Sequence, residues 1–389
     1  MNLLLTMAIF LIAAVSCTDD PPPAEEEDFT ISENITENTT WETGNVYQLG
    51  GRIAVLDGVT LTIEPGVIIK GEAGTGSNAT ALVVARGATL IAEGTASQPI
   101  IFTSVADEIM PGDVASPNLD PTLNGLWGGL IILGNATISA DAASVQIEGI
   151  PASDQNGLYG GSDDTDNSGS IKYISIRHGG ANIGEGNEIN GLTLGGVGSG
   201  TVIENVEIVS NQDDGIEWFG GAVSISNVVV WNTGDDAIDT DQAWSGTLDN
   251  FVIVNPGDEC FELDGGEGNF NKMHTIMNGS VSAGAAEGLA DLDDKGAAGT
   301  IGNSYVDMSN IYFFDVAYGQ DFDDNPADLS ASNFELTVPS DTLTASDFFV
   351  DGVDTAVSIV ADGANSLGAD MSKFTGWSWA AVSGALDGF

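Results

Sequence analysis

Acidic residues recur in pairs along the middle of the chain, at spacings that suit cation binding or acid–base catalysis. The three occurrences of the pattern are Asp213, Asp214 and Glu217; Asp235, Asp236 and Asp239; and Asp258, Glu259 and Glu262. Carboxylate oxygens are the preferred ligands of Ca²⁺. Two carboxyl groups at a fixed separation can also serve as the reacting pair of a glycosidase. If the segments that carry these residues stack on one another, the side chains form a ladder of like charges.

The acidic pairs lie in three tandem repeats, Asn205–Trp218, Asn227–Thr240 and Asn250–Leu263. Each repeat has a β-branched run, a turn, the acidic pair and a second short apolar run. Successive repeats begin 22 and then 23 residues apart, which is typical of one coil of a parallel β-helix. Coils stack at the strand spacing of about 4.8 Å. We therefore expect an all-β fold, a right-handed parallel β-helix solenoid over residues 41–325, with a C-terminal cap over residues 326–389.

Several other residues have positions that indicate structural roles. Four asparagines open successive strand runs, and their stacked amides are expected to bond along the axis: Asn205, Asn227, Asn250 and Asn310. Cys260 lies within a strand pattern and is expected in the core. Trp377 and Trp379 are expected to pack on the last coil. Arg177 and His178 are expected to form a satisfied surface pair.

The charge of the chain limits its partners. It carries 58 acidic and 8 basic side chains, a net charge of -50. No basic patch is present to neutralise phosphates, so nucleic acid is excluded as a partner, whereas divalent cations are attracted. Two like charges about 5 Å apart repel by roughly 3 kcal/mol at an effective dielectric constant near 20. A stacked ladder of carboxylates therefore requires full solvation, raised pKa values or bound cations.

Three interpretations of the ladder remain open. The acids are solvated turn residues that bind local amides, or they hold divalent cations, or they are catalytic, with Asp213, Asp214 and Asp236 as the reacting groups. Trp faces beside carboxylates suit sugar rings, unless the Trp covers a turn or lies in the core. The predicted ligand-binding face consists of Asp213, Asp214, Glu217, Trp218, Asp235, Asp236 and Asp239.

A second candidate cation site precedes the ladder. Asp164, Asp166 and Ser168 supply oxygens at positions 1, 3 and 5 of a loop, and Gly169 follows at position 6, as in the first half of a calcium loop. Ser175 stands where such a loop carries its bidentate Glu. A Ca²⁺ site with Asp164, Asp166 and Ser168 as ligands and a plain Asp/Asn/Ser turn both remain open.

The N-terminus predicts export and lipidation. Residues 3–15 are apolar but too few to span a bilayer, as expected of a signal peptide over residues 1–16. Small residues precede Cys17, and the segment resembles a bacterial lipobox, which implies a lipid anchor on Cys17. Residues 17–40 begin with a Pro-rich acidic run typical of a disordered tether. That run resembles the surface-export signal of Bacteroidota lipoproteins, which implies lipid-anchored display on the outer membrane.

The chain from the lipobox to the tail resembles a group of Bacteroidota surface lipoproteins with a right-handed, pectate-lyase-like parallel β-helix. The segments that carry the resemblance are Val59–Gly71, Gly160–Tyr173 and Ile189–Gly221. Residues 211–216 also resemble the Asp-Asp motif of polygalacturonases, but the Gly-His-Gly of that family is missing from the next repeat. We therefore expect an outer-surface lipoprotein that binds an extracellular polymer such as a glycan, with Ca²⁺ as a structural or bridging ion. A polysaccharide-degrading glycosidase or lyase and a non-catalytic adhesive scaffold are the alternatives.

Overall fold

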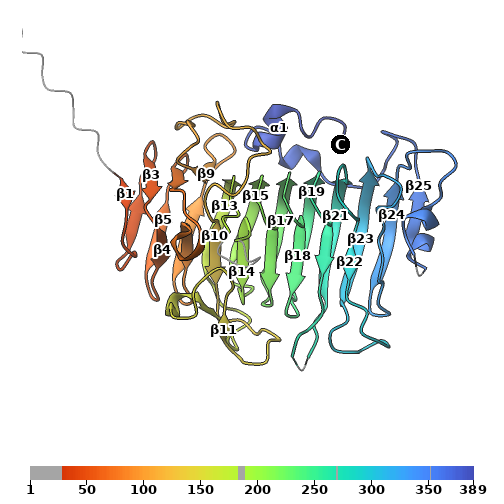
Figure 1. The fold of residues 1–389 in the computed structure, drawn as a ribbon, viewed down its shortest axis with the longest axis horizontal. Coiled ribbons are helices and arrows are strands. Elements are labelled where there is room, and N and C mark those ends of the chain that lie inside the picture. Colours follow the sequence, from red (N-terminus) through yellow and green to blue (C-terminus); the bar gives the residue numbers. More distant parts are fainter. Residues whose placement is uncertain (1–28, 183–188, 269, 351) are drawn as a thin grey trace, which may run out of the picture.

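The structure is a computed structural model that describes residues 29–389 except 183–188, 269 and 351. Its strands form successive coils that follow one another along the longest axis of the molecule, from the N-terminal to the C-terminal end (Figure 1). Strand pairing within the two large sheets is parallel. This architecture confirms the all-β parallel β-helix that the repeats predicted.

Sheet A contains fifteen strands and extends over the whole length of the stack. Its strands are β1 (Thr30–Ile31), β2 (Thr39–Trp41), β3 (Val46–Leu49), β5 (Thr60–Ile63), β6 (Ile68–Gly71), β8 (Thr89–Glu93), β9 (Ile100–Ser104), β13 (Gly169–Arg177), β15 (Val202–Val209), β17 (Ile225–Trp231), β19 (Thr247–Val254), β21 (His274–Ser282), β23 (Val306–Phe314), β24 (Ser330–Leu336) and β25 (Val357–Ile359).

Sheet B contains eight shorter strands. They are β4 (Arg52–Val55), β7 (Ala81–Val84), β10 (Leu130–Leu133), β14 (Leu192–Gly195), β16 (Ile216–Phe219), β18 (Ile238–Asp241), β20 (Phe261–Leu263) and β22 (Asp291–Leu292). The remaining elements are the antiparallel pair β11 (Val145–Gln146) and β12 (Leu158–Tyr159), the α-helix α1 (Trp379–Ser383), and the 3₁₀ turns η1 (Gly76–Asn78), η2 (Gln155–Gly157), η3 (Ala345–Asp347), η4 (Val353–Ala356) and η5 (Met371–Lys373). Within the described ranges, no helix is long and apolar enough to cross a membrane.

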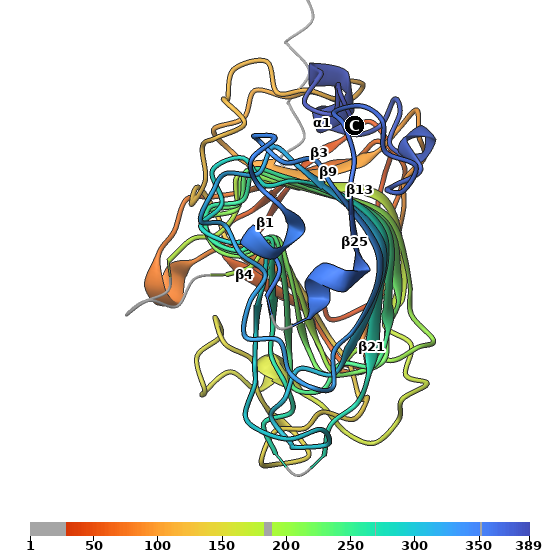
Figure 2. The ribbon, with the colours of Figure 1, turned by 90° about the vertical axis from the view of Figure 1, so that its right-hand side faces the viewer.

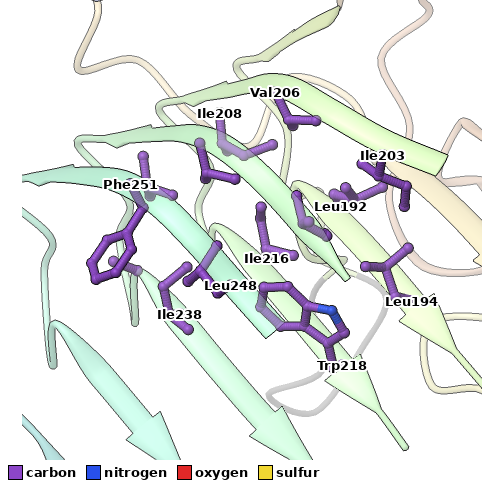
Figure 3. Close-up of a cluster of buried hydrophobic side chains, with 14 of the residues drawn as sticks. Leu192, Leu194, Ile203, Val206, Ile208, Ile216, Trp218, Ile238, Leu248 and Phe251 are labelled. Carbon is purple, nitrogen blue, oxygen red and sulfur yellow. The ribbon is translucent and has the colours of Figure 1, made fainter. Parts of the chain in front are cut away.

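Side chains from both sheets point into the coils and form one continuous core. On β16, Ile216 and Trp218 are fully buried in it, and Figure 3 shows them beside Ile208 of β15 and Ile238 of β18. Because side chains alternate along a strand, the residues between them point outward. Cys260 also lies in this core and is fully buried, as expected.

Asparagines bend the long strands of sheet A. Asn205, Asn227 and Asn250 adopt left-handed backbone conformations with φ of 58°, 58° and 59°, which Asn tolerates better than most residues. Amides at these positions also bond along the axis: Asn250 Nδ2 donates to Asn227 Oδ1 at 2.8 Å, and Asn310 Nδ2 donates to Asn278 Oδ1 at 3.2 Å. The structural interpretation of these asparagines is therefore confirmed. A second bend follows five residues later, for example at Asn232 and Asn255, and was not predicted.

Replacing Asn250 by Ala is expected to lower the free energy of unfolding by about 2 kcal/mol, because Ala loses both the hydrogen bonds and the tolerance for positive φ. Asn250→Gly loses the bonds to Asn227 and to the N–H of Asp370 but adopts the same backbone conformation freely, so about half of that loss is expected. Urea unfolding measures the difference. Equal losses in the two variants would show that backbone conformation contributes nothing at this bend.

The coil stack extends past both predicted boundaries. β1 and β2 pair in parallel with β3 and β5, although the tether was predicted to reach residue 40. At the other end, β24 pairs with β23 and β25 pairs with β24, within residues that were predicted to form the cap. Three of these four strands, β1, β2 and β25, are only two or three residues long, and the terminal coils lack the acidic pairs of the repeat, so the repeat pattern did not reveal them.

Two parts of the C-terminal region cover the stack in different places. The turns around η3 and η4 close its end, where Phe348, Phe349 and Val353 join the core (Figure 2). Residues 360–389, which we call the C-terminal segment, turn back along the outer face of sheet A beside β15–β21 (Figure 1). Trp377 and Trp379 are buried there. They pack as predicted, but on the flank of the coils rather than on the last coil.

Candidate functional site

Parallel pairing places the predicted carboxylates in rows along the outer face of sheet B. Glu217 of β16 pairs with Asp239 of β18, which pairs with Glu262 of β20. Asp291 of β22 follows in the same register, and we call these four residues the strand row. Because their neighbours on each strand face the core, the four side chains point away from it. Successive members are one strand spacing, about 4.8 Å, apart.

A second row lies in the turns that lead into these strands. This turn row consists of Asp214, Asp236 and Glu259. The backbone N–H of Asp236 donates to Asp214 Oδ1 at 3.1 Å, and the N–H of Glu259 donates to Asp236 Oδ1 at 2.6 Å. Asp214 and Asp236 therefore each cap the backbone of the next coil, as expected of turn acids, and use only one of their two oxygens to do so.

A third row, the outer row, consists of the half-buried residues Asp213, Asp235 and Asp258. Carboxylate oxygens of adjacent coils converge in three groups within these rows, and within each group they lie no more than 4.8 Å apart: Asp213, Asp214 and Asp235; Asp235, Asp236 and Asp258; and Asp214, Glu217 and Asp239. A fourth group joins Asp291, at the exposed end of the strand row, to Asp323 and Asp324. We call the three rows together the carboxylate ladder. A single cation could take a ligand from each member of such a group.

A loop packs on the outer face of sheet B beside one end of the ladder. The outer face of sheet B begins as an apolar surface, where Val83 and Ile131 pack with Ile150 and Tyr159 of the loop between β10 and β13. This loop projects from one corner of the stack (Figure 2). Glu217 lies at the border of the covered surface and is only 6% exposed. Toward β22 the ladder opens to solvent, and its last member is exposed.

Burial and mutual repulsion raise the pKa of several ladder carboxyl groups. For Glu217 the largest cause is desolvation, followed by the charge of Asp214. Desolvation and a hydrogen bond with Glu262 raise the pKa of Asp236 to about 10. Desolvation, followed by the charge of Asp258, raises the pKa of Glu259 to about 8. In the absence of a cation, the folded chain therefore holds protons on the ladder at neutral pH.

The turn row and the strand row lack close basic partners among the described residues. In the part of the chain that the structure describes, no member of the turn row or the strand row forms an ion pair with Lys or Arg. Nearby, Lys295 pairs with Asp293 instead. Close carboxylates without a basic partner must keep protons or bind cations. The outer face of sheet B thus has the chemistry of a cation-binding surface.

Trp218 does not belong to this face, and its prediction as a ligand-binding residue was wrong. Its side chain is fully buried in the core and stacks on Trp244, with ring centroids 4.6 Å apart. The reason is the alternation along β16, because Glu217 points outward and its neighbour must therefore point inward. The other predicted members of the face lie together on the ladder.

The predicted calcium loop makes the contacts of a turn. Asp164 Oδ2 accepts a hydrogen bond from Lys272 Nζ at 2.9 Å. Asp166 Oδ1 accepts one from Asn135 Nδ2 at 3.0 Å, and Ser168 Oγ donates to Asp166 Oδ2 at 3.4 Å. Among the described residues, neither Asp164 nor Asp166 belongs to a group of three converging His, Cys, Asp or Glu side chains. Protein donors thus take the place of a cation, which favours the alternative of an Asp/Asn/Ser turn; calcium at this loop stays a prediction.

Arg177 and His178 are fully buried, so the prediction of a surface pair was wrong. The C-terminal segment covers them. The guanidinium of Arg177 lies over the ring of Trp379, 4.9 Å from its centroid, and Arg177 Nη2 lies 3.7 Å from Glu207 Oε2. The backbone N–H of Ala380 donates to Glu207 Oε1 at 2.9 Å. Arg177 and Glu207 therefore hold the C-terminal segment against sheet A, and this contact lies apart from the ladder.

Comparison with known proteins supports the fold. A family model described as a pectate-lyase like beta helix domain matches residues 33–381. No curated protein and no solved structure matches the chain.

Proposed function

The chain belongs to the pectate-lyase-like beta-helix family, and on that basis we propose that it binds an extracellular polysaccharide on the outer face of sheet B, with Ca²⁺ held by the carboxylate ladder. The observation that carries the proposal is the convergence of ladder oxygens to within 4.8 Å in three groups on one face. Oxygen-only sites made of several carboxylates suit Ca²⁺, which accepts irregular coordination, better than the smaller Mg²⁺, which demands near-ideal octahedral geometry.

The outer row would form the part of the site that exchanges ligands. Asp213, Asp235 and Asp258 are half-buried, so a cation bound to them keeps coordination positions that sugar hydroxyls or carboxylates can fill. Cations at these positions would also reduce the repulsion between an anionic polymer and a chain of net charge -50. Sites repeated at about 4.8 Å along one axis fit an extended polymer better than a compact small molecule.

The proposal includes display on the cell surface. Its support is the lipobox-like sequence that ends at Cys17 and the acidic, Pro-rich run after it. The signal peptide, Cys17 and the first part of the predicted tether lie outside the described residues. A lipid anchor on Cys17 would hold the β-helix at the outer membrane, and the tether would let it reach extracellular polymers.

A polysaccharide-degrading enzyme is the second candidate, and one observation favours it. The pKa of Asp236 is raised to about 10, so this carboxyl keeps a proton at neutral pH, as a general acid must. Asp214 lies one coil away and bonds to the backbone of Asp236. With Asp213 it would supply the second carboxylate of a glycosidase pair. Catalysis and binding would then use the same face.

The experiment uses the soluble chain from Thr18 onward, incubated with neutral and acidic polysaccharides, with Ca²⁺ and with chelator. Affinity electrophoresis measures retention, and mass spectrometry detects released oligosaccharides. Retention of at least one polymer is expected in Ca²⁺, with a loss of about tenfold or more in chelator and in the double variant Asp235→Asn/Asp258→Asn. The control Asp341→Asn, an exposed acid outside the ladder, is expected to bind like the parent.

Each other outcome points to a different function. Fragments that appear with the parent but not with Asp236→Asn would make the ladder an active site and replace the binding proposal. Absence of both retention and fragments over the whole panel would leave the adhesive scaffold. Retention that is identical in Ca²⁺ and in chelator would support polysaccharide binding but would show that Ca²⁺ takes no part in it.

A further inference from the structure

A cavity of about 490 Å³ lies between the C-terminal segment and the ends of the sheet A strands. Val254, Ser282 and Phe314 are the last residues of β19, β21 and β23 and form one wall. Asp387 and Phe389 of the C-terminal segment form another. The volume is within the range of sites for small organic ligands. None of the cavity-lining residues belongs to the carboxylate ladder.

The floor of the cavity is apolar and aromatic. The ring of Phe314 stacks on Tyr312, with centroids 5.1 Å apart and planes at 12°. The ring of Phe389 meets Phe314 edge-on, with centroids 4.7 Å apart and planes at 82°. Val316, Val338, Pro339 and Ala385 add to the apolar lining. Packing against one another fixes the rings in place, so the floor is formed before any ligand arrives.

The rim of the cavity is acidic. Asp315, which follows β23, and Asp362 and Asp387, from the two ends of the C-terminal segment, line it, and all three are exposed. Ser282 Oγ donates to Asp315 Oδ2 at 3.3 Å and so orients that carboxylate. No Lys, Arg or His is among the lining residues. An apolar floor below three carboxylates is complementary to a ligand that is apolar at one end and positively charged at the other.

We propose that this cavity binds a small organic ammonium ion, with its apolar body on Phe314 and Phe389 and its ammonium group among the carboxylates of Asp315, Asp362 and Asp387. The ammonium group offers three donors to these acceptors, and aromatic rings attract cations through their faces. A bare metal ion fits less well, because half of the lining cannot coordinate it. A neutral ligand of the same shape would leave the charge of the rim unused.

The test compares three probes of nearly equal shape by isothermal titration calorimetry at about 0.15 M NaCl, where long-range attraction is screened. The probes are 2-phenylethylammonium, 2-phenylethanol and phenylacetate, titrated into the soluble chain from Thr18 onward. The ammonium probe is expected to bind about tenfold tighter than the alcohol, and phenylacetate is expected to bind weakest of the three.

Two double variants with the same change in net charge locate the site. Asp362→Asn/Asp387→Asn removes two rim carboxylates at exposed positions. It is expected to lower the affinity for the ammonium probe about tenfold and to leave the affinity for the alcohol unchanged. Asp141→Asn/Asp341→Asn removes two exposed acids outside the cavity and is expected to leave both affinities within about twofold.

Three results would overturn the proposal. Undetectable binding of the ammonium probe would exclude the site. Equal affinity for ammonium and alcohol would show that the rim carboxylates contribute nothing. An equal loss in both double variants would show that the probe is only a counter-ion of the acidic surface. Because no ladder residue is changed, failure here leaves the polysaccharide proposal untouched.

Discussion

In a chelating buffer, the melting temperature is expected to fall by on the order of 5–10 °C as the pH rises from 6 to 9, and saturating Ca²⁺ is expected to abolish most of this fall. The cause is the set of protons that the folded chain holds on the acidic face of sheet B. Burial and neighbouring carboxylates raise the pKa to about 10 at Asp236 and to about 8 at Asp241 and Glu259. In the unfolded chain the same groups ionise near pH 4.

The direction of the change follows from which state holds the protons. Above about pH 4 the unfolded chain has lost protons that the folded chain still carries, so unfolding releases protons and becomes easier as the pH rises. The contribution of these protonated carboxyl groups to the stability of the folded chain is complete below about pH 4. It is lost as the pH rises through their raised pKa values of about 8 and about 10.

Between pH 6 and 9, few groups other than these carboxyls can cause a fall in the melting temperature. Ordinary carboxyl groups are already ionised in both states there. The chain has only two histidines, and desolvation lowers the pKa of both, to about 3 for His274 and below its ordinary value for His178. Because the pKa of each histidine is lower in the folded chain than in the unfolded chain, both histidines favour the folded chain more as the pH rises, which is the opposite of the expected fall. A fall in the melting temperature between pH 6 and 9 then reports the ladder and the carboxyl groups beside it, to which the buried thiol of Cys260, whose pKa is raised by burial, adds above about pH 8.

A bound cation favours the ionised form of the ladder carboxyl groups over the protonated form. It stabilises ionised carboxylates, so the folded chain no longer depends on their protons. Ca²⁺ that binds only the folded chain also raises the melting temperature with concentration. The pH dependence and the calcium dependence thus have one origin, the repulsion within the rows.

The variant Asp236→Asn separates the two roles of a ladder carboxylate. Asn keeps an oxygen that can accept the N–H of Glu259, but it has no charge. In chelator at pH 9 the variant is expected to have a higher melting temperature than the parent. The rise in melting temperature that Ca²⁺ causes is expected to be smaller in the variant than in the parent. Asp341→Asn is the control and should change neither quantity. If the melting temperature of the parent in chelator did not depend on pH, repulsion within the rows could not be the cause.

The register of the ladder could be predicted from the sequence, but its burial could not. Repeats of nearly constant length bring Glu217, Asp239 and Glu262 into line because coils stack with equivalent positions in contact. The burial of Glu217 reflects non-repeating neighbours: Asn190, which donates to it, and Glu148 of the loop between β10 and β13, which packs on the start of the face. That loop has no repeat, so nothing in the period indicated which carboxylates it would cover.

Two errors have different physical origins. The orientation of Trp218 was available in the sequence, because an outward Glu217 requires an inward neighbour on the same strand. The burial of Arg177 could not be predicted from the sequence. It depends on the C-terminal segment, where Ala380 contacts Glu207 across 173 residues of chain. Contacts that distant leave no local pattern, and a charged pair beside a strand is ordinarily a surface feature.

Glu207→Ala is expected to lower the free energy of unfolding by about 3–5 kcal/mol, since it leaves Arg177 charged and buried without its partner. Both side chains are fully buried, and their nearest charged atoms are 3.7 Å apart. The variant also removes the acceptor for the N–H of Ala380. Limited proteolysis should therefore release part of the C-terminal segment from the variant under conditions in which the parent resists cleavage.

Glu204→Ala is the matched control for this loss. Glu204 lies on the same strand, and its ion pair with Lys172 has an N···O distance of 4.0 Å with both side chains partly exposed, so a change of less than about 1 kcal/mol is expected. The double variant Arg177→Met/Glu207→Leu should recover most of the stability, because apolar side chains can replace a buried ion pair. Equal losses for Glu204→Ala and Glu207→Ala would mean that the segment is held by its apolar contacts alone. A double variant as unstable as Glu207→Ala would instead assign the loss to the Ala380 contact, not to the uncompensated charge.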